Sequence, residues 1–241
     1  MRSLPVRPNL PFQTVQRLNA AVISIQGNAN PVAEAERVFD NARRSQWFVP
    51  VIEALRGMTG PGERCMFCSG SESSNVEHFQ PKAVFPALAM AWDNFLWACD
   101  ICNRSKGIRF PPVNHPGERL IDPTSEYVWT FFFIDEYGNL TARWNNDIGD
   151  VDRRALNTID LLSLDREALQ QTRQYRLKDL KAKALDCLQL TASGMLNTDE
   201  VRARIEEWKI QPFQLDVADY FLNGPGKGEE PFAALFTAAG L

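Results

Sequence analysis

The sequence lacks the features that mark membrane and secreted proteins. It contains no run of 18 apolar residues, so no segment is expected to span a bilayer. Its opening stretch, MRSLPVRPNLPFQTVQRL, has no apolar core before a small-residue cleavage site, and a secretory signal is not expected. We therefore expect a cytoplasmic protein without a membrane partner, in a compartment where thiols stay reduced.

The chain also lacks an excess of basic side chains. It has 26 Lys and Arg against 30 Asp and Glu, for a net charge of −4. A protein that binds nucleic acid by electrostatics alone is usually basic. Any contact with nucleic acid must therefore be local, assisted by a metal ion or supported by a partner protein.

Cysteine and histidine are scarce, with five and two residues, but most of them lie in one stretch. Four cysteines form two C-x-x-C pairs, Cys65 with Cys68 and Cys99 with Cys102. Four thiolates fill the tetrahedral shell of Zn²⁺ and leave no position for water, which predicts a structural zinc site. The 30 residues between the pairs exceed the spacer of a plain zinc ribbon, so a further element must be inserted there.

The residues that predict chemistry lie in this insertion or directly after the second cysteine pair. Glu77 and His78 stand together in NVEHFQPK, Asn94 lies in AWDNFLWAC, and Asn103 directly follows the last cysteine of the pairs. A histidine of near-neutral pKa can deprotonate water. Carboxylate and amide oxygens are ligands that suit Mg²⁺, so a second, catalytic metal ion is expected beside the zinc.

The pattern C-x2-C-x8-E-H-x15-N-x4-C-x2-C-N-x2-K-G resembles the HNH endonuclease family, which has a ββα-metal fold. The similarity covers residues 64 to 111, and the flanks HFQPK and RFP fit the same subfamily. Farther along, ERLIDP, the Phe-rich stretch and TIDLLSLDREAL are similar to HNH proteins of bacterial anti-phage systems, of the Septu type or associated with retrons. In such systems an HNH protein works beside an ATPase partner.

The resemblance implies a role for each motif residue. His78 would be the general base, and Glu77 and Asn103 would hold Mg²⁺ or Mn²⁺. Asn94 would orient the strand of the histidine, and the four paired cysteines would bind zinc. This chain departs from the commoner pattern with Glu in place of Asp before the histidine, and with Asn in place of the last His.

Two lysines are candidates for binding the substrate. Lys106 follows Asn103 by three residues, which places both on one face of a short helix, where Lys106 can hold a phosphate near the metal. Lys82, in HFQPK, is a second candidate for contact with the nucleic-acid backbone. The other histidine, His115, stands in a Pro/Gly-rich loop without neighbouring ligands and is interpreted as an ordinary loop residue.

Outside the motif the pattern is mostly helical. Residues 30 to 58 have apolar side chains at helical spacing, with a break at Pro50, and the chain after 150 is similar, with Thr198 as a helix N-cap. Residues 127 to 144 predict a hairpin that turns at Gly138 and Asn139.

The expected fold class is α+β, mostly helical, with a central zinc-stabilised ββα-metal module and a further β-hairpin. We expect three regions: a helical region at 1–60, the module at 61–125, and a hairpin with C-terminal helices at 126–241.

The expected function is that of a metal-dependent HNH endonuclease, a hydrolase acting on phosphodiester bonds of nucleic acid, with DNA as the favoured substrate and anti-phage defence as the setting. Two alternatives stay open. In the first, the chain is a zinc-stabilised module that binds nucleic acid or a partner protein without turnover. In the second, it is a subunit that is active only with an ATPase partner.

Overall fold

The computed structural model describes residues 1–241 except 61, 71, 74, 112–115 and 212–214. The fold class is α+β, as predicted: helices surround small antiparallel strand pairs. The helices are α1 (Phe12–Gln26), α2 (Pro31–Ala42), α3 (Val49–Thr59), α4 (Asp100–Lys106), α5 (Arg153–Leu162), α6 (Glu167–Ala192), α7 (Thr198–Lys209), α8 (Leu215–Ala218) and α9 (Phe232–Ala238). The strands are β1 (Asn75–His78), β2 (Phe95–Ala98), β3 (Phe132–Ile134), β4 (Leu140–Ala142), β5 (Trp144–Asn145) and β6 (Asp150–Val151).

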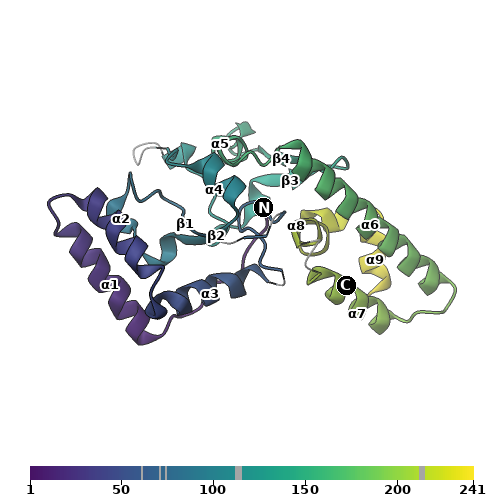
Figure 1. The fold of residues 1–241 in the computed structure, drawn as a ribbon. Helices are drawn as coiled ribbons and strands as arrows, with labels where there is room; N and C mark the ends of the chain where they lie inside the picture. The colour runs from purple at the N-terminus through teal and green to yellow at the C-terminus, as the bar shows by residue number, and fades with distance from the viewer. Residues whose placement is uncertain (61, 71, 74, 112–115, 212–214) are drawn as a thin grey trace.

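Two groups of helices stand at opposite ends of the molecule. Figure 1 shows α1, α2 and α3 around β1 and β2 at one end, and α6, α7 and α9 at the other. Helices α4 and α5 contact each other between them. No helix within the described ranges is both long and apolar enough to cross a membrane. The division into three regions, with boundaries after residues 60 and 125, stays a prediction.

The N-terminal helices differ from the expected single helical stretch. Helix α2 begins after Asn30, whose side chain accepts a hydrogen bond from the amide of Ala33 at 3.2 Å, with Pro31 at its first position. The α-helical stretch is interrupted at residues 43–48, before Pro50. Pro50 lies in the first turn of α3, where its missing N–H costs little. Helix α1 lies within the predicted helical region at 1–60, although no separate helix was predicted over its residues.

The predicted hairpin is confirmed as β3 and β4, with Phe132 opposite Ala142 and Ile134 opposite Leu140. Gly138 adopts the expected positive φ, +83°. The carboxylate of Asp135 closes the turn, because it accepts hydrogen bonds from the backbone amides of Tyr137 and Asn139 at 2.9 and 2.8 Å. In the C-terminal helices, the N-cap of α7 is Asn197 rather than the expected Thr198.

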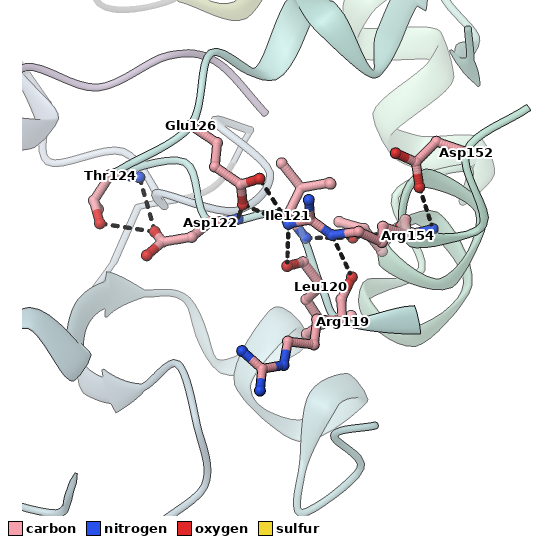
Figure 2. A network of polar contacts seen from close by, with 9 residues as sticks. Arg119, Leu120, Ile121, Asp122, Thr124, Glu126, Asp152 and Arg154 are labelled. Atoms are coloured by element: carbon pink, nitrogen blue, oxygen red, sulfur yellow. Dashed lines mark hydrogen bonds and ion pairs between the residues drawn. The ribbon is translucent and has the colours of Figure 1, made fainter. Parts of the chain in front are cut away.

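A polar network fixes the ERLIDP segment, residues 118–123, against α5 (Figure 2). Arg154 forms an ion pair with Glu126 at 2.6 Å and donates to the backbone carbonyls of Arg119 and Leu120. The amide of Ile121 donates to the buried Thr158 hydroxyl at 2.8 Å. The ERLIDP segment therefore has a structural role: it packs the chain after the cysteine-bearing unit against α5.

The same segment is also tied to β2 through a residue near the N-terminus. The Arg7 guanidinium donates to the Thr124 hydroxyl at 3.1 Å and to the backbone carbonyls of Phe95 and Trp92 at 2.8 and 3.2 Å. The two sets of contacts connect α5 to the strand pair that carries the candidate site.

We predict that Gly138→Ala lowers the free energy of unfolding by more than ~2 kcal/mol, since L residues are strained at positive φ. A Cβ there would also lie 2.5 Å from the backbone oxygen of Gln170 and 2.6 Å from the amide nitrogen of Gln174, both in α6. Gly149→Ala is the matched control, because Gly149 has a φ of +65° with open space around it. Denaturant unfolding should show the larger loss for Gly138→Ala; equal losses would contradict packing of this turn on α6.

Candidate metal centre and active site

The four paired cysteines converge on one point. The sulfur atoms of Cys65, Cys68, Cys99 and Cys102 all lie within 4.8 Å of one another, and all four residues are buried. The Sγ atoms of Cys68 and Cys99 are 3.9 Å apart. Four Zn–S bonds of tetrahedral geometry would place sulfur atoms ~3.8 Å apart. The cluster is therefore close enough, and of the right chemistry, to bind a zinc ion.

The surroundings of the cluster suit the negative charge of a tetrathiolate. The Arg166 side chain, at the start of α6, is partly buried, which disfavours its charged form, but the neighbouring Cys102 and Cys68 outweigh this and raise its pKa. The amide of Gly70 donates to the Cys68 sulfur at 3.4 Å. Gly70 also packs so closely on Leu169 of α6 that a Cβ would overlap the leucine methyl group.

The cluster joins the two ends of a β1–β2–α4 unit. Strands β1 and β2 pair antiparallel, with Glu77 opposite Leu96 and His78 opposite Phe95. Cys99 follows β2 and is the N-cap residue of α4, and Cys102 lies within that helix. The amide of Met66, between the first two cysteines, donates to the Trp97 carbonyl at 2.9 Å, which ties this first pair to β2.

His78 ends β1 and is nearly fully buried. Its Nε2 lies 2.9 Å from the backbone oxygen of Ala89. A carbonyl oxygen only accepts hydrogen bonds, so Nε2 carries the proton and Nδ1 keeps its lone pair. The rings of Phe39 and Phe95 stand edge-on to the imidazole, with centroids 4.5 and 5.4 Å away.

The charge state of His78 follows from this apolar enclosure. Burial lowers the pKa of His78 to about 4, and the nearby cations Lys82 and Lys106 lower it further, while the bond to Ala89 opposes the shift. The imidazole is therefore neutral near pH 7 with the lone pair of Nδ1 available, but its pKa lies below the near-neutral value expected from the sequence, which makes it a weaker base.

Asn94 closes the loop between the two strands. Its amide nitrogen donates to the carbonyls of Gln80 and Leu88, both at 3.0 Å, and its side-chain oxygen accepts from the Gln80 amide at 2.8 Å. The amide of Phe79 donates to the Asn94 carbonyl at 2.8 Å. Because Phe79 directly follows His78, Asn94 fixes the backbone that carries the imidazole.

Glu77 and Lys106 form a buried ion pair. The Lys106 Nζ lies 2.7 Å from Oε1 of Glu77; the lysine side chain is fully buried, and that of Glu77 is 11% exposed. Burial raises the pKa of Glu77, and the lysine counteracts this. Burial likewise lowers the pKa of Lys106, opposed by Glu77. Lys106 was expected to hold a phosphate, but the structure places it beneath Glu77 rather than at the surface.

Four of the predicted residues line one cleft. Glu77, His78, Lys82 and Asn103 all line a hollow of about 420 Å³. Asn103 and Lys82 are both half-buried, and the Lys82 ammonium lies 5.8 Å from the ring centroid of Phe39. Glu77 and Asn103, from two different elements, thus line the same hollow as His78. Asn94 does not line this hollow but holds the loop between β1 and β2. His115 lies outside the described residues.

Sequence reasoning missed the other wall of the cleft. Phe39 and Asp40 of α2, with Arg43 and Arg44 directly after it, line the same hollow. The spacing of apolar residues identified a helix there, and the Arg43-Arg44 pair was visible in the sequence. No local pattern indicates that the end of this helix faces a histidine more than 30 residues later.

Comparison with known proteins supports one part of the predicted kinship. No protein-family model matches the chain. The chain is similar to the Septu protein PtuB of Bacillus thuringiensis, with 29% identity over 142 residues. These residues make up 56% of this chain and 49% of that protein, so the chain spans about half the length of the curated relative it matches. The similarity supports the Septu-type link that the motifs indicated.

We predict that the purified chain holds about one zinc ion and that Cys102→Ser abolishes its binding, because three thiolates and a hydroxyl are a much poorer shell. Cys187→Ser is the matched control, since Cys187 is buried in α6 outside the cluster. Metal analysis by mass spectrometry and thermal unfolding measure both effects. Full zinc content in Cys102→Ser would contradict the assignment.

We predict that Asn94→Ala lowers the free energy of unfolding by about 2–4 kcal/mol, because it leaves one donor and two acceptors, all partly buried, without their partner. Asn157→Ala is the comparison: its side chain is half-buried and donates one hydrogen bond, to the Glu118 carbonyl at 2.8 Å. Its expected cost is ~1 kcal/mol. Chemical denaturation measures the loss in the free energy of unfolding for both variants. A smaller loss for Asn94→Ala than for Asn157→Ala would contradict the proposed role of Asn94 in fixing the loop.

Proposed function

We propose that this protein is a metal-dependent endonuclease of the HNH type that hydrolyses phosphodiester bonds in nucleic acid, with DNA as the favoured substrate. The observation that carries the proposal is the state of His78, neutral with a free Nδ1, in the same cleft as Glu77 and Asn103. A structural histidine in an apolar core has no need of a carboxylate and an amide beside it.

His78 acts as the general base in this proposal. Its Nδ1 accepts a proton from the attacking water, while Nε2 stays bonded to the Ala89 carbonyl and prevents the ring from turning. The imidazolium formed is stabilised by that carbonyl. Asn94 acts through the backbone, as a positioning residue for the imidazole.

Glu77 and Asn103 are the residues that would hold Mg²⁺ or Mn²⁺. When bound, such an ion supplies positive charge that stabilises the developing charge on the phosphate and the departing oxygen. Lys106 lies against Glu77 and favours its ionised form, which opposes the effect of burial on the carboxyl group. We therefore propose for Lys106 a positioning role toward Glu77, and for Lys82 direct contact with the substrate.

The setting proposed is anti-phage defence, supported by the similarity to the Septu protein PtuB. Because the matched region is about half of that protein, the activity and the partners of the whole relative remain proposals for this chain. An ATPase partner is proposed on the same ground. In that case the isolated chain would show weak turnover that rises when the partner is added.

One observation favours a second candidate, a zinc-stabilised binding module without turnover. The Lys106 ammonium already occupies one oxygen of Glu77, where a divalent ion would otherwise find its negative charge. If the lysine neutralises Glu77 permanently, the cleft binds phosphate but does not activate water. Cleavage of plasmid DNA that depends on added Mg²⁺ or Mn²⁺ separates the two candidates.

We predict that His78→Ala reduces the cleavage rate at least ~100-fold, the usual contribution of a general base. A plasmid-nicking assay with Mg²⁺ or Mn²⁺, with and without EDTA, measures the effect. His115→Ala, which changes the chain's other histidine, is the matched control and should retain activity. Zinc content and unfolding temperature confirm that both variants are folded. Wild-type cleavage by a folded His78→Ala chain would remove this residue from the mechanism.

A further inference from the structure

The wall of the cleft that faces β1 is built by the end of α2. Phe39 of this helix packs edge-on against the His78 imidazole, with ring centroids 4.5 Å apart. Arg43 follows Phe39 by four residues, about one helical turn or ~6 Å along the axis. Arg43 and its neighbour Arg44 line the cleft that holds the proposed base. The packing of Phe39 therefore positions two arginines relative to His78.

This wall supplies positive charge that the cysteine-bearing unit lacks. Residues 65 to 110 contain four basic and four acidic side chains: Lys82, Arg104, Lys106 and Arg109, and Glu72, Glu77, Asp93 and Asp100. One of these cations, Lys106, is fully buried against Glu77. Among the described residues that line the cleft, Lys82 is then the cation that the cysteine-bearing unit contributes. Further cations must come from other elements.

The two arginines of the wall differ in how they are held. Arg43 forms an ion pair with Asp40 at 2.9 Å, and both side chains are substantially exposed. Arg44 is also exposed, and no hydrogen bond or ion pair joins it to any residue that the structure describes. A guanidinium that lines a cleft without an internal partner has all its donors available for a ligand.

We propose that Arg44 binds a backbone phosphate of the nucleic-acid substrate, next to the scissile phosphate, with Lys82 binding the backbone from the β1 side of the cleft. The inference rests on the proposed endonuclease function and names the contact that the chain uses to hold its substrate. The planar guanidinium fits phosphate oxygens in a two-point arrangement. Arg43 contributes charge but stays partly neutralised by Asp40.

The contact is with the backbone rather than the bases. The aromatic rings nearest the wall, Phe39 and Trp97, are buried at 7% and 6% exposure and offer no free face for stacking. Phosphate contacts hold and orient a nucleic acid but carry no sequence information. We therefore expect this wall to give similar affinity for different sequences. It also answers how a chain of net charge −4 can hold a polyanion: the attraction is confined to the cleft.

The test compares Arg44→Gln with Arg37→Gln in a His78→Ala chain, so that binding is measured without cleavage. Arg37, within α2, is the control: it is two residues from Phe39, on the other face of the helix, and paired with Glu34 at 2.6 Å. Fluorescence anisotropy of a short labelled DNA duplex of mixed sequence gives Kd at several salt concentrations. Thermal unfolding and zinc content verify that each variant is folded.

We expect Arg44→Gln to raise Kd about two- to fivefold, as for the loss of one exposed ion pair. The slope of log Kd against log salt should become shallower by about 0.9, the share of one phosphate contact with a duplex. Arg44→Lys should restore most of the slope, since it keeps the charge, and Arg37→Gln should change neither quantity. In the cleaving chain, Arg44→Gln should raise KM and leave kcat unchanged.

Equal Kd and slope in Arg44→Gln and Arg37→Gln would overturn the inference, whether both variants match the parent chain or both bind more weakly. The absence of any DNA binding by the His78→Ala chain would overturn it as well. The proposed endonuclease function fails separately. If the chain binds DNA through Arg44 but never cleaves it, the phosphate contact is supported and the endonuclease function is contradicted. If the chain cleaves DNA without dependence on Arg44, the endonuclease function is supported and the phosphate contact is contradicted.

Discussion

The convergence of four thiolates is the constraint on which the rest of the candidate site depends. The β1–β2–α4 unit consists of two strands of four residues and a helix of seven, too little to stay folded by its own burial. The cysteine cluster links the segment before β1 to the segment after β2 and to α4. Glu77, in β1, and Asn103, in α4, therefore reach one cleft because sulfur atoms elsewhere in the unit fix both elements.

The cleft combines two opposite environments around a single strand end. The ring of His78 lies among phenylalanines, which keep it uncharged, while Glu77, the preceding residue, faces a buried ammonium group. Alternation of side chains along a strand makes this separation available to adjacent residues. In the proposed mechanism, His78 is the uncharged base and Glu77, paired with Lys106, is a ligand of the metal ion.

Local signals in the sequence were sufficient for much of this arrangement. The spacing of Cys65 to Cys102 indicated one metal centre, and Gly138 in a β-prone stretch indicated the hairpin. The burial of Lys106 against Glu77 was not predictable in the same way. The three-residue spacing from Asn103 places both residues on one helix face but does not say what packs on that face. The wall formed by α2 was missed for a related reason: contact between Phe39 and His78 depends on how separate elements pack, which local periodicity does not encode.

The close approach of Gly70 and Leu169 has a consequence for how the molecule is put together. The first turns of α6 rest on the loop that follows Cys68, and Arg166 stands beside the sulfur atoms. The start of the long helix α6 therefore packs directly on the cysteine cluster. Zinc binding by the four cysteines is therefore expected to stabilise the packing of α6 as well as the cleft.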